Sequence, residues 1–353
     1  MKRVLITNIT GYKAVVIASF LKKNYNDIQI FGIDSNNFSK IFHTNSIDKY
    51  FQITTDNQYI DSIGKIIREE DIDLLIPTHS NEMELLLKNR FKLGDSLDYF
   101  GSYESFQNLN NKLSLSNICT ELNIKIPKSY NSLSNKGFPY VVKPSHSAAS
   151  KGVMYIFDHS SYRNAKSVYQ NKKNIVIQEY ILGTGVGYSI FSKNGRIIVG
   201  YGHKRMAEHP VSGGSSVYRD EYIDKRMKKI ASKIISHLDW SGFAMFEFKL
   251  TNENELFLIE VNPRIWGSIN QGLSNGINYF SHLLGTPTNP LKNDRAYNTY
   301  LSPLVYISLF KYGIKLRLEP IKRFLLNISK NKPDISIIKD PYGWIGVVLR
   351  SLL

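Results

Sequence analysis

The sequence predicts a mixed fold, in which an α/β region built on a parallel sheet precedes an α+β region built on β-hairpins. Over residues 3–77, short apolar strand patterns alternate with helical patterns, which is typical of a parallel sheet covered by helices. Beyond residue 138, strand patterns follow one another across short turns, including the hairpin signal Asn194-Gly195. A length of 353 residues accommodates two or three domains of this kind.

The composition is that of an ordinary globular protein, with 42% hydrophobic and 21% charged residues. Cys119 is the single cysteine, which excludes internal disulfides and cysteine-based zinc clusters and indicates a reducing compartment. The apolar stretch at residues 4–6 ends at Thr7-Asn8, too early for the core of a signal peptide. No stretch reaches the roughly 18 apolar residues of a membrane span. We therefore expect a cytoplasmic protein.

The N-terminal region contains three strand patterns, at residues 3–8, 28–33 and 73–77, with a helical pattern after the first strand and another over residues 60–70. The loop after the first strand offers only Gly11, where a dinucleotide-binding loop has the pattern G-x-G-x-x-G. We therefore expect the loops of this sheet to face a ligand other than NAD.

After a boundary near residues 101–111, the pattern changes to helices and antiparallel strands. Helices are expected over residues 112–122 and 225–238. The expected strands are residues 138–144, 154–157, 175–180, 189–193, 196–201, 242–250 and 255–261. The segment 182–187 is expected to be a glycine-rich turn into the strand at residue 189.

Two glutamates on the last hairpin are candidate metal ligands. Glu247 lies mid-strand between two phenylalanines, and Glu260 precedes Asn262 by two residues on the return strand, so Glu260 and Asn262 share a face. A short turn around residues 252–254 can bring Glu247 opposite Glu260. Two carboxylates and an amide oxygen are hard ligands that suit Mg²⁺ better than zinc. We therefore predict a Mg²⁺ site, with Mn²⁺ as an alternative ion.

Arg264 follows this cluster directly after Pro263. A guanidinium beside a magnesium site is typical of phosphate binding, because it can hold two phosphate oxygens at once. The alternative is a solvated strand face or a structural ion pair. The run Glu-Val-Asn-Pro-Arg after a paired Phe-Glu-Phe strand favours the ligand site.

These motifs, in this order, resemble the ATP-grasp superfamily and, within it, its carbamoyl-phosphate-synthase-like branch. Each motif is weak alone, and the ordered set, which covers roughly residues 105–285, is specific. The motifs are Asn111-Lys112, Tyr140-Val141-Val142-Lys143-Pro144, the loop 145–152, Gln178-Glu179-Tyr180-Ile181, Phe246-Glu247-Phe248 and Glu260-Val261-Asn262-Pro263-Arg264.

The resemblance implies a domain organisation. A Rossmann-like domain would occupy residues 1–108. A two-lobed ATP-grasp domain would follow over residues 109–285, with an interlobe hinge near 179–183. Residues 286–353 would form a C-terminal extension.

The resemblance also implies that Lys112 and Lys143 bind the phosphates of ATP. Lys143 ends an apolar strand, where a buried ammonium is costly without an anion. Lys112 opens a helix, and the alternative is an exposed helix lysine. The small side chains of the loop 145–152, with Ser147, Ser150 and Gly152, would let backbone amides close over the phosphates as a lid. The alternative for this loop is a plain hairpin connection.

The segment from Glu179 through Tyr180 to Ile181 resembles the hinge that contacts adenine, where Glu179 would bind the exocyclic amine. The alternative for Glu179 is a solvated strand end. Many relatives place an acid several residues after this hinge, where it binds the ribose. Residues 183–187 contain no acid, so the ribose contact is open.

A second cluster lies between the hinge and the metal motif and extends past Arg264. Arg205 could hold the γ-phosphate or an acyl phosphate, so Arg205 and Arg264 are the candidate catalytic residues. The candidate substrate-binding residues are His203, Gly214, Ser215, Ser216 and Trp266. For two of them a structural role is the alternative: His203 as an ordinary histidine at a strand end, and Trp266 as a tryptophan of the core.

The resemblance implies an ATP-dependent ligase that forms an amide from a carboxylate and an amine through an acyl phosphate. No Ser–His–Asp or Cys–His arrangement is found, which agrees with chemistry that needs no protein nucleophile. Two other hypotheses stay open. One is an ATP-grasp protein that binds nucleotide without catalysis, and the other is a sugar-nucleotide oxidoreductase that uses the first α/β unit.

The chain carries 45 basic and 30 acidic residues, a net charge of +15. This charge fits an anionic acceptor such as a uronic-acid sugar of a polysaccharide or cell-envelope precursor. It is not interleaved with an RNA-binding aromatic motif, so we expect no nucleic-acid partner. Residues 286–353 carry 11 basic and 4 acidic residues beside apolar runs. They are expected either to cap the core or to contact the inner face of a membrane. The sequence leaves a homo-oligomer open.

Overall fold

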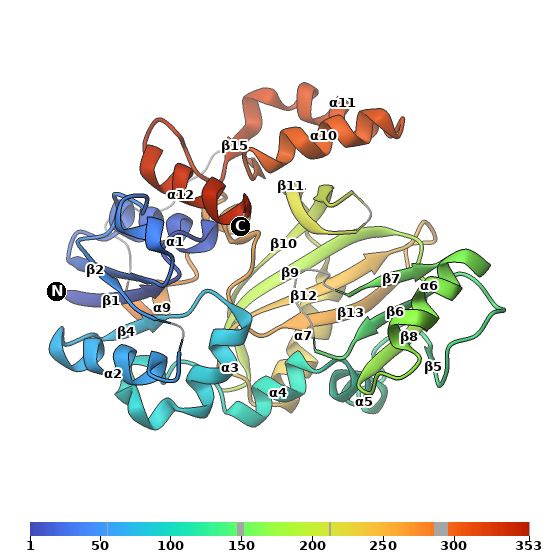
Figure 1. Ribbon diagram of the computed structural model, residues 1–353, viewed down its shortest axis with the longest axis horizontal. Coiled ribbons are helices and arrows are strands. Elements are labelled where there is room, and N and C mark those ends of the chain that lie inside the picture. Colours follow the sequence, from blue (N-terminus) through green and yellow to red (C-terminus); the bar gives the residue numbers. More distant parts are fainter. Residues whose placement is uncertain (55, 147–151, 212, 286–295, 353) are drawn as a thin grey trace.

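The computed structural model of the protein describes residues 1–353 except 55, 147–151, 212, 286–295 and 353. The strands of the described residues form three sheets (Figure 1). The expected fold class is confirmed, because a parallel sheet with helices precedes two sheets built mainly from antiparallel strands. No helix among the described residues has the length and apolar character needed to cross a membrane.

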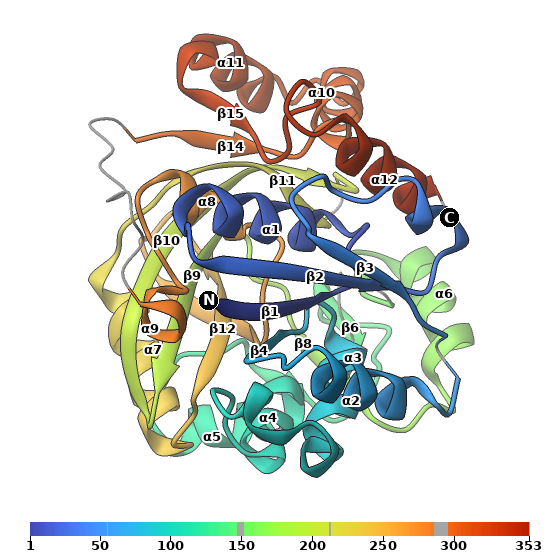
Figure 2. The same ribbon diagram turned by 90° about the vertical axis from the view of Figure 1, so that its left-hand side faces the viewer.

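The N-terminal sheet is parallel, with the strand order β3-β2-β1-β4. Figure 2 shows helix α1 on one side of this sheet and helices α2 and α3 on the other. Because both faces are covered, β1 and β2 are nearly continuous buried runs. The elements are β1 (Lys2–Thr7), α1 (Tyr12–Asn24), β2 (Ile28–Asp34), β3 (Lys49–Gln52), α2 (Tyr59–Glu69), β4 (Leu74–Ile76) and α3 (Ser80–Lys88).

The order of the strands reverses between β1 and β4, since β2 and β3 lie on one side of β1 and β4 on the other. In α/β folds a ligand crevice forms at the carboxyl ends of the strands that flank such a reversal. Strand β3 was not expected from the sequence, because it is only four residues long and none of its residues is buried.

Two short helices, α4 (Tyr103–Asn110) and α5 (Lys112–Glu121), lead from the first sheet to the second. The side chain of Asn111 accepts a hydrogen bond of 2.9 Å from the backbone N–H of Leu113 and thereby caps α5. Lys112 is therefore the first residue of α5. Its backbone N–H donates to the carbonyl of Ser145 at 3.1 Å, which ties this helix to the second sheet.

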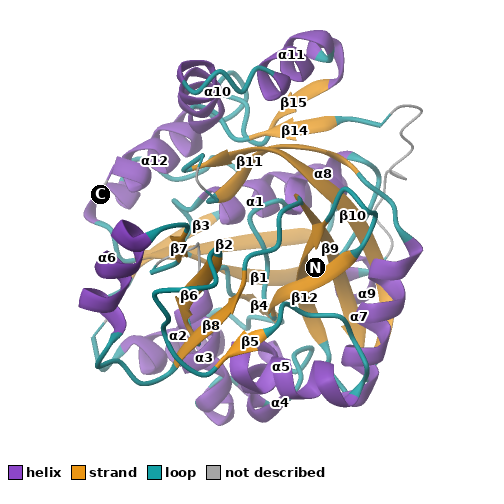
Figure 3. Cartoon of the chain, turned by 90° about the vertical axis from the view of Figure 1, so that its right-hand side faces the viewer, coloured by secondary structure: helices purple, strands orange, loops and turns teal. Residues whose placement is uncertain are grey.

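The second sheet has the order β5-β8-β6-β7 and is antiparallel. Figure 3 shows it in front of the larger third sheet. Helix α6 packs on this sheet, with Ala165 and Tyr169 in a small core beside Tyr140 and Val142. The elements are β5 (Ser129–Tyr130), β6 (Tyr140–Pro144), β7 (Met154–Ile156), α6 (His159–Tyr169) and β8 (Ile175–Glu179).

The third sheet has the order β13-β12-β9-β10-β11-β14-β15. The expected Asn194-Gly195 hairpin is confirmed, and both residues have positive φ, as a two-residue hairpin turn requires. The expected turn at residues 182–187 is wrong in part, because β9 already begins at Thr184. The elements are β9 (Thr184–Lys193), β10 (Arg196–His209), β11 (Ser215–Glu221), α7 (Lys225–His237), β12 (Gly242–Leu250), β13 (Leu256–Asn262), α8 (Ile269–Ser274) and α9 (Ser281–Leu284).

The C-terminal extension continues the third sheet, because β14 pairs with β11 and β15 pairs with β14. A fully buried ion pair of 2.8 Å between Arg219 of β11 and Asp334 fixes this junction. Helix α12 lies beside α1 of the N-terminal region (Figure 1). The elements are β14 (Asn298–Tyr300), α10 (Leu304–Ile314), α11 (Glu319–Leu326), β15 (Asn331–Pro333) and α12 (Pro341–Leu352).

Candidate active site

Glu247 and Glu260 face each other across β12 and β13 because of a β-bulge. Leu250 pairs with Leu256 and Phe248 with Leu258, so a regular ladder would place Ile259 opposite Glu247. Between Phe248 and Glu247 the register shifts by one residue, so that Glu260 is the partner of Glu247. An extra residue in one strand re-aims the side chains beyond it. The sequence predicted this pair of carboxylates but not the bulge that creates it.

Asn262 and three cations surround the two carboxylates. The Asn262 side-chain amide donates to Glu247 Oε1 at 3.2 Å and to Glu260 Oε1 at 3.3 Å. Lys112 Nζ lies 3.3 Å from Glu260 Oε2. An Arg205 guanidinium nitrogen donates to Glu247 Oε2, and Arg264 donates to Asn262 Oδ1 at 2.7 Å. The three residues predicted to bind metal therefore lie in one cluster with Lys112, Arg205 and Arg264.

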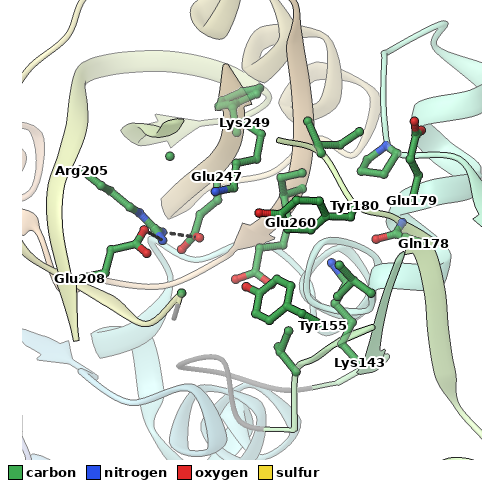
Figure 4. Close-up of a pocket in the computed structure, with 18 residues that line it drawn as sticks. Lys143, Tyr155, Gln178, Glu179, Tyr180, Arg205, Glu208, Glu247, Lys249 and Glu260 are labelled. Atoms are coloured by element: carbon green, nitrogen blue, oxygen red, sulfur yellow. Dashed lines mark hydrogen bonds and ion pairs between the residues drawn. The ribbon is translucent and has the colours of Figure 1, made fainter. Parts of the chain in front are cut away.

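The second sheet supplies the opposite wall of a cavity above this cluster. In Figure 4, Lys143, Tyr155, Gln178 and Tyr180 lie across the cavity from Glu247. Glu179 also lines the cavity, but its carboxylate points away from Glu247 and Glu260 and accepts from the Lys128 backbone N–H at 3.3 Å. Ile181, from the expected hinge, also lines the cavity. The backbone N–H of Glu179 donates to the carbonyl of Lys128 at 2.8 Å, so β8 keeps its extended form up to this point.

Three residues of the loop 145–152 were expected to bind phosphate. Ser147 and Ser150 lie outside the described residues. Gly152 has a φ of +74°, a conformation that favours glycine, and its carbonyl accepts a hydrogen bond from the Tyr169 hydroxyl. A Cβ atom at this position would also meet the Tyr169 hydroxyl at 2.8 Å, which explains why residue 152 is a glycine.

The buried charges of the cluster shift one another's pKa values. Burial lowers the pKa of Lys143 to about 8, although Glu260 opposes this shift. Burial raises the pKa of Glu247 despite the neighbouring Arg205. Burial also acts on Glu260, but the ammonium groups of Lys112 and Lys143 prevail and hold its pKa below the ordinary value. The Glu260 carboxylate and the Lys143 ammonium therefore carry opposite charges at neutral pH.

The donor atoms fit a metal-bound polyphosphate. Arg205 Nε is buried and has no hydrogen-bond partner among the described residues, so it is available to an anion. Two carboxylates leave ligand positions for phosphate oxygens and water, as Mg²⁺ prefers. Nowhere in the described parts of the chain do three or more His, Cys, Asp or Glu side chains gather as a metal site. Asn262 could bind a metal through Oδ1 after its amide turns over, because Nδ2 now faces the carboxylates.

A second cavity adjoins the first on the far side of Glu247 and Glu260. It is lined by Arg264 and by four of the residues expected to bind the substrate, His203, Gly214, Ser215 and Ser216. Tyr12, Lys13 and His79 of the N-terminal region complete it, and none of the three was predicted from the sequence. Burial, with Arg264 nearby, lowers the pKa of Lys13 well below its ordinary value. No local pattern marks these residues, because the fold brings them to the cavity from more than 120 positions away.

His203 is buried and lies close to Ser268, whose hydroxyl is 3.3 Å from His203 Nε2. Burial, together with Arg205 and Arg219, lowers the pKa of His203 to about 3, so the imidazole is neutral at physiological pH. A Cβ atom at Gly187 on the neighbouring strand would clash with this ring. The glycine-rich segment 183–187 therefore makes room for side chains of β10.

The expectation that Trp266 lines the acceptor pocket is wrong. Its side chain is 1% exposed and packs edge-to-face on Tyr279, with ring centroids 5.0 Å apart. Gly267 and Ser268, the next two residues, reach the second cavity instead. A large apolar ring gains more from burial in the core than from contact with a polar pocket. Glu208 and Lys249, which the sequence analysis did not select, line the first cavity near the hinge.

At the carboxyl edge of the N-terminal sheet, the Asp34 carboxylate is paired with the protein's own groups. Asp34 ends β2, where dinucleotide-binding folds place the acid that binds the ribose. Here its carboxylate accepts from the Thr10 hydroxyl at 2.6 Å, from the Thr10 backbone N–H at 3.0 Å and from Arg350 of α12 at 3.0 Å. The Asp34 carboxylate is therefore already bound by donors of the protein itself, where a dinucleotide-binding fold would bind the ribose.

Two family models match the chain. Residues 109–268 match the ATP-grasp domain, and residues 4–95 match the PylC-like N-terminal domain. The first match contains Lys112, Lys143, Arg205, Glu260 and Arg264. The second contains Tyr12, Lys13 and His79.

Individual proteins agree with these matches. The chain is 26% identical over 132 residues to D-alanine–D-alanine ligase of Aquifex aeolicus, a region that is 35% of this chain and 45% of that protein. It is 23% identical over 180 residues to the carbamoyl phosphate synthase large chain of Vibrio cholerae, 48% of this chain and 17% of that one. The chain thus spans less than half the length of either relative.

A solved structure, the L-amino acid ligase of Bacillus licheniformis, has the same fold. It superposes with a TM-score of 0.60 at 18% identity and covers 83% of this chain and 74% of its own. At this identity the likeness concerns the fold alone.

Proposed function

Because the chain carries an ATP-grasp domain behind a PylC-like N-terminal domain, we propose that it is an ATP-dependent ligase that joins a carboxylate to an amine. One observation carries the proposal. Glu247 and Glu260 face each other while Lys112, Lys143, Arg205 and Arg264 surround them. Phosphoryl transfer requires mainly positioning and charge neutralisation, and this cluster offers both.

In this proposal ATP binds in the cavity between the second and third sheets. The segment 179–181 would contact the adenine edge, and Lys112 and Lys143 would neutralise phosphate oxygens. Glu247, Glu260 and Asn262 would hold Mg²⁺, with Mn²⁺ as a substitute. When bound, the ion supplies neutralisation of the charge on the transferring phosphoryl group.

The second cavity would hold the acceptor. A substrate carboxylate oxygen attacks the γ-phosphorus, the bond to the β,γ-bridging oxygen breaks, and ADP leaves. The amine nitrogen then attacks the carbonyl carbon of the acyl phosphate, and the carbon–oxygen bond breaks to release phosphate. Arg205 and Arg264 hold the phosphoryl oxygens. Lys13, with its lowered pKa, lies in the second cavity, where it can take up the proton that the amine loses.

The net charge of +15 favours an anionic acceptor, and a uronic-acid sugar of a polysaccharide or cell-envelope precursor is the class that we propose. The ATP requirement and the single buried cysteine suit the cytoplasm. His203, Ser215 and Ser216 offer a neutral imidazole and two hydroxyls, which would orient the acceptor without adding charge.

Two alternatives are less favoured by particular observations. An oxidoreductase would need the edge of the N-terminal sheet, but Thr10 and Arg350 already bind Asp34 there. A protein that binds nucleotide without catalysis would not need to keep both carboxylates and all four surrounding cations.

The test is a panel of carboxylates and amines, each pair incubated with Mg²⁺ and ATP while ADP release is measured. We expect ADP release that depends on the carboxylate, and hydroxylamine should trap the acyl phosphate as a hydroxamate. ATP binding without ADP release across a panel that includes sugar acids, amino acids and peptides would support the inactive alternative. Oxidation of an added nicotinamide cofactor would support the oxidoreductase.

A further inference from the structure

The C-terminal extension exposes an apolar surface that the proposed ligase reaction does not use. We define the hairpin face as Tyr306, Phe310, Ile314, Leu316, Leu325 and Leu326, whose exposed fractions run from 52% to 82%. It lies on α10, on α11 and on the loop between them. These two helices lie at one end of the molecule, at the top of all three ribbon views (Figures 1–3).

Helix α10 is apolar on both sides. Val305, Leu309 and Tyr312 point inward and belong to a buried cluster with β11 and α11. Tyr306, Phe310 and Ile314 recur every four residues and form a stripe on the outer side. A surface helix normally carries polar residues there, so an apolar outer stripe indicates a contact with something outside the chain.

Exposed apolar side chains concentrate in this part of the molecule. Among the described residues, 12 of the 23 exposed large hydrophobic side chains lie between residues 306 and 342. Others, such as Phe91 and Ile223, lie far from the extension in the sequence. Scattered single residues of that kind are ordinary, whereas a contiguous patch marks an interaction surface.

Basic side chains surround the hairpin face. Residues 304–330 contain six lysines and arginines and one acid, a net charge of +5. The acid, Glu319, is paired with Arg323 at 2.8 Å. Lys311, Lys322 and Lys330 are all exposed, and their long stems can lie along the apolar surface while their charges stay in water.

We propose that the hairpin face docks on the surface of an anionic lipid bilayer. Apolar side chains can enter the headgroup boundary while the basic ones bind acidic headgroups, which is how surface-bound helices attach. Helix α10 has 11 residues, about 16 Å, too short to span the bilayer, so it would lie along the surface. The mixture of lysines with exposed leucines fits lipid better than a protein partner, whose interface core is depleted in lysine.

The position of α10 would bring the membrane close to both cavities. The helix begins at Leu304, which lines a cavity next to the proposed acceptor site together with Leu301 and Val347. Near the other end of α10, Tyr312 and Lys315 line a further cavity that shares Tyr155, Tyr180 and Lys249 with the nucleotide cavity. Docking itself does not depend on the proposed ligase activity, and it can be measured without substrate.

The experiment measures binding of the full chain to vesicles of phosphatidylcholine alone or with 30 mol% phosphatidylglycerol, by co-sedimentation. We expect binding to the anionic vesicles at low salt, at least tenfold weaker binding at high salt, and little binding to neutral vesicles. The variant Phe310→Ser/Leu316→Ser/Leu326→Ser should bind at least tenfold more weakly. The matched control Phe91→Ser/Ile223→Ser, which removes equally exposed side chains elsewhere, should bind like the wild type.

A charge series separates specific docking from general attraction. Replacing Lys311, Lys322 and Lys330 by Gln should weaken binding by about a hundredfold, since each basic residue near the surface contributes to it. Replacing three exposed lysines of α7, Lys225, Lys228 and Lys229, removes the same charge and should leave most of the binding. Equal losses in both triple variants would overturn the docking site.

A fluorescent probe gives a readout that does not depend on the folding of a triple variant. Cys119 is buried, and burial raises its pKa to about 12, so a single Leu316→Cys can be labelled selectively with an environment-sensitive dye. The emission should shift to the blue with anionic vesicles, and the same dye at Phe91→Cys should not shift. An unchanged emission at residue 316 would overturn the proposal. A dimer in light scattering that the serine variant abolishes, without vesicle binding, would instead assign the face to a second copy of the chain.

Discussion

Two regions of this molecule bury charged groups, one at the carboxyl edge of the N-terminal sheet and one on strands β10, β12 and β13 of the third sheet, and they differ in how those groups are paired. At the N-terminal sheet, Asp34 accepts hydrogen bonds from Thr10, Asn36 and Arg350. The second region is the cleft, by which we mean the two cavities on either side of Glu247 and Glu260. There, Arg205 Nε has no partner among the described residues, and burial lowers the pKa of Lys143 to about 8. A protein usually pairs its buried polar groups. The Asp34 cluster is therefore served by the protein's own donors, whereas the cluster around Glu247 keeps one buried donor, Arg205 Nε, without a partner among the described residues, which supports the proposed anion site.

The largest expected effect in the cleft comes from Glu260→Gln. The change replaces the Glu260 carboxylate, which lies 3.3 Å from Lys112 and is one of the three predicted metal ligands, by an amide. We expect the maximal rate of ADP release to fall about 10²–10³-fold while nucleotide affinity falls only in part. Steady-state kinetics and calorimetric titration with ADP measure the two effects. Glu255→Gln, in an exposed ion pair before the same strand, is the control. A near-normal rate with saturating Mg²⁺ would refute the metal assignment.

Arg264→Lys should lower the maximal rate of ADP release although the substitution keeps the positive charge. A guanidinium holds two oxygens, whereas an ammonium presents one compact charge. We expect a loss of about 2–4 kcal/mol in transition-state stabilisation, with a smaller effect on ATP affinity. The maximal rate, the ATP affinity and the melting temperature are measured together. A near-normal rate with a lowered melting temperature would mean that Arg264 only holds Asn262 and the following loop.

Asp34→Asn tests whether the Asp34 cluster of the N-terminal sheet serves stability alone. The substitution removes the charge that binds Thr10 and Arg350, and we expect the free energy of unfolding to fall by about 2–3 kcal/mol. ADP release per folded molecule should stay normal. Urea denaturation measures the stability, and Asp27→Asn, in an exposed ion pair with the N-terminal amine, is the control. A loss of activity at full stability would show that Asp34 serves a ligand.

The pH dependence of nucleotide binding reports on Lys143. A bound polyphosphate favours the charged ammonium and raises the pKa of Lys143 from about 8 towards its ordinary value near 10.5. Binding then takes up a proton between these values. Affinity for ADP should be constant below pH 8 and fall up to tenfold per pH unit above it. Calorimetry at pH 9 in buffers of different ionisation enthalpy measures the proton uptake. Absence of uptake would contradict a phosphate contact at Lys143.

The smallest effect is expected from Trp266→Phe. This variant tests whether Trp266 belongs to the core or to the acceptor site. Trp266 packs on Tyr279 away from both cavities, so the substrate KM should change less than twofold. The free energy of unfolding should fall by about 1–2 kcal/mol because a smaller ring leaves space in the core. Kinetics and thermal melting measure both. A large change in KM with unchanged stability would restore Trp266 to the acceptor site.

Local patterns predicted the fold class, and the ordered motifs predicted several of the charged residues that line the first cavity. Strand periodicity and turn residues are local signals, and the ordered motifs around Lys143, Glu247 and Asn262 lie on strands that the sequence marks clearly. The pairing of Glu247 with Glu260 followed from a short hairpin, although the bulge at Ile259 that makes it possible has no signal in the sequence.

The residues that the sequence did not indicate depend on contacts between distant segments. Lys13 and His79 line the second cavity only because the fold brings them together with residues of β10 and β13. Trp266 carries no local sign that Tyr279 will cover it. Strand β14 is three residues long and exists because β11 offers it an edge.

The contact of Arg350 with Asp34 and Thr10 also affects the order in which the chain can fold. The partners Thr10 and Arg350 are 340 residues apart. A ribosome that adds about 5–20 residues per second needs roughly 20–70 s to make that interval. During that time the first sheet emerges with the Asp34 carboxylate lacking its guanidinium. The ion pair between Asp34 and Arg350 can therefore form only after helix α12 has been synthesised. The N-terminal region is made first but completes its folding late.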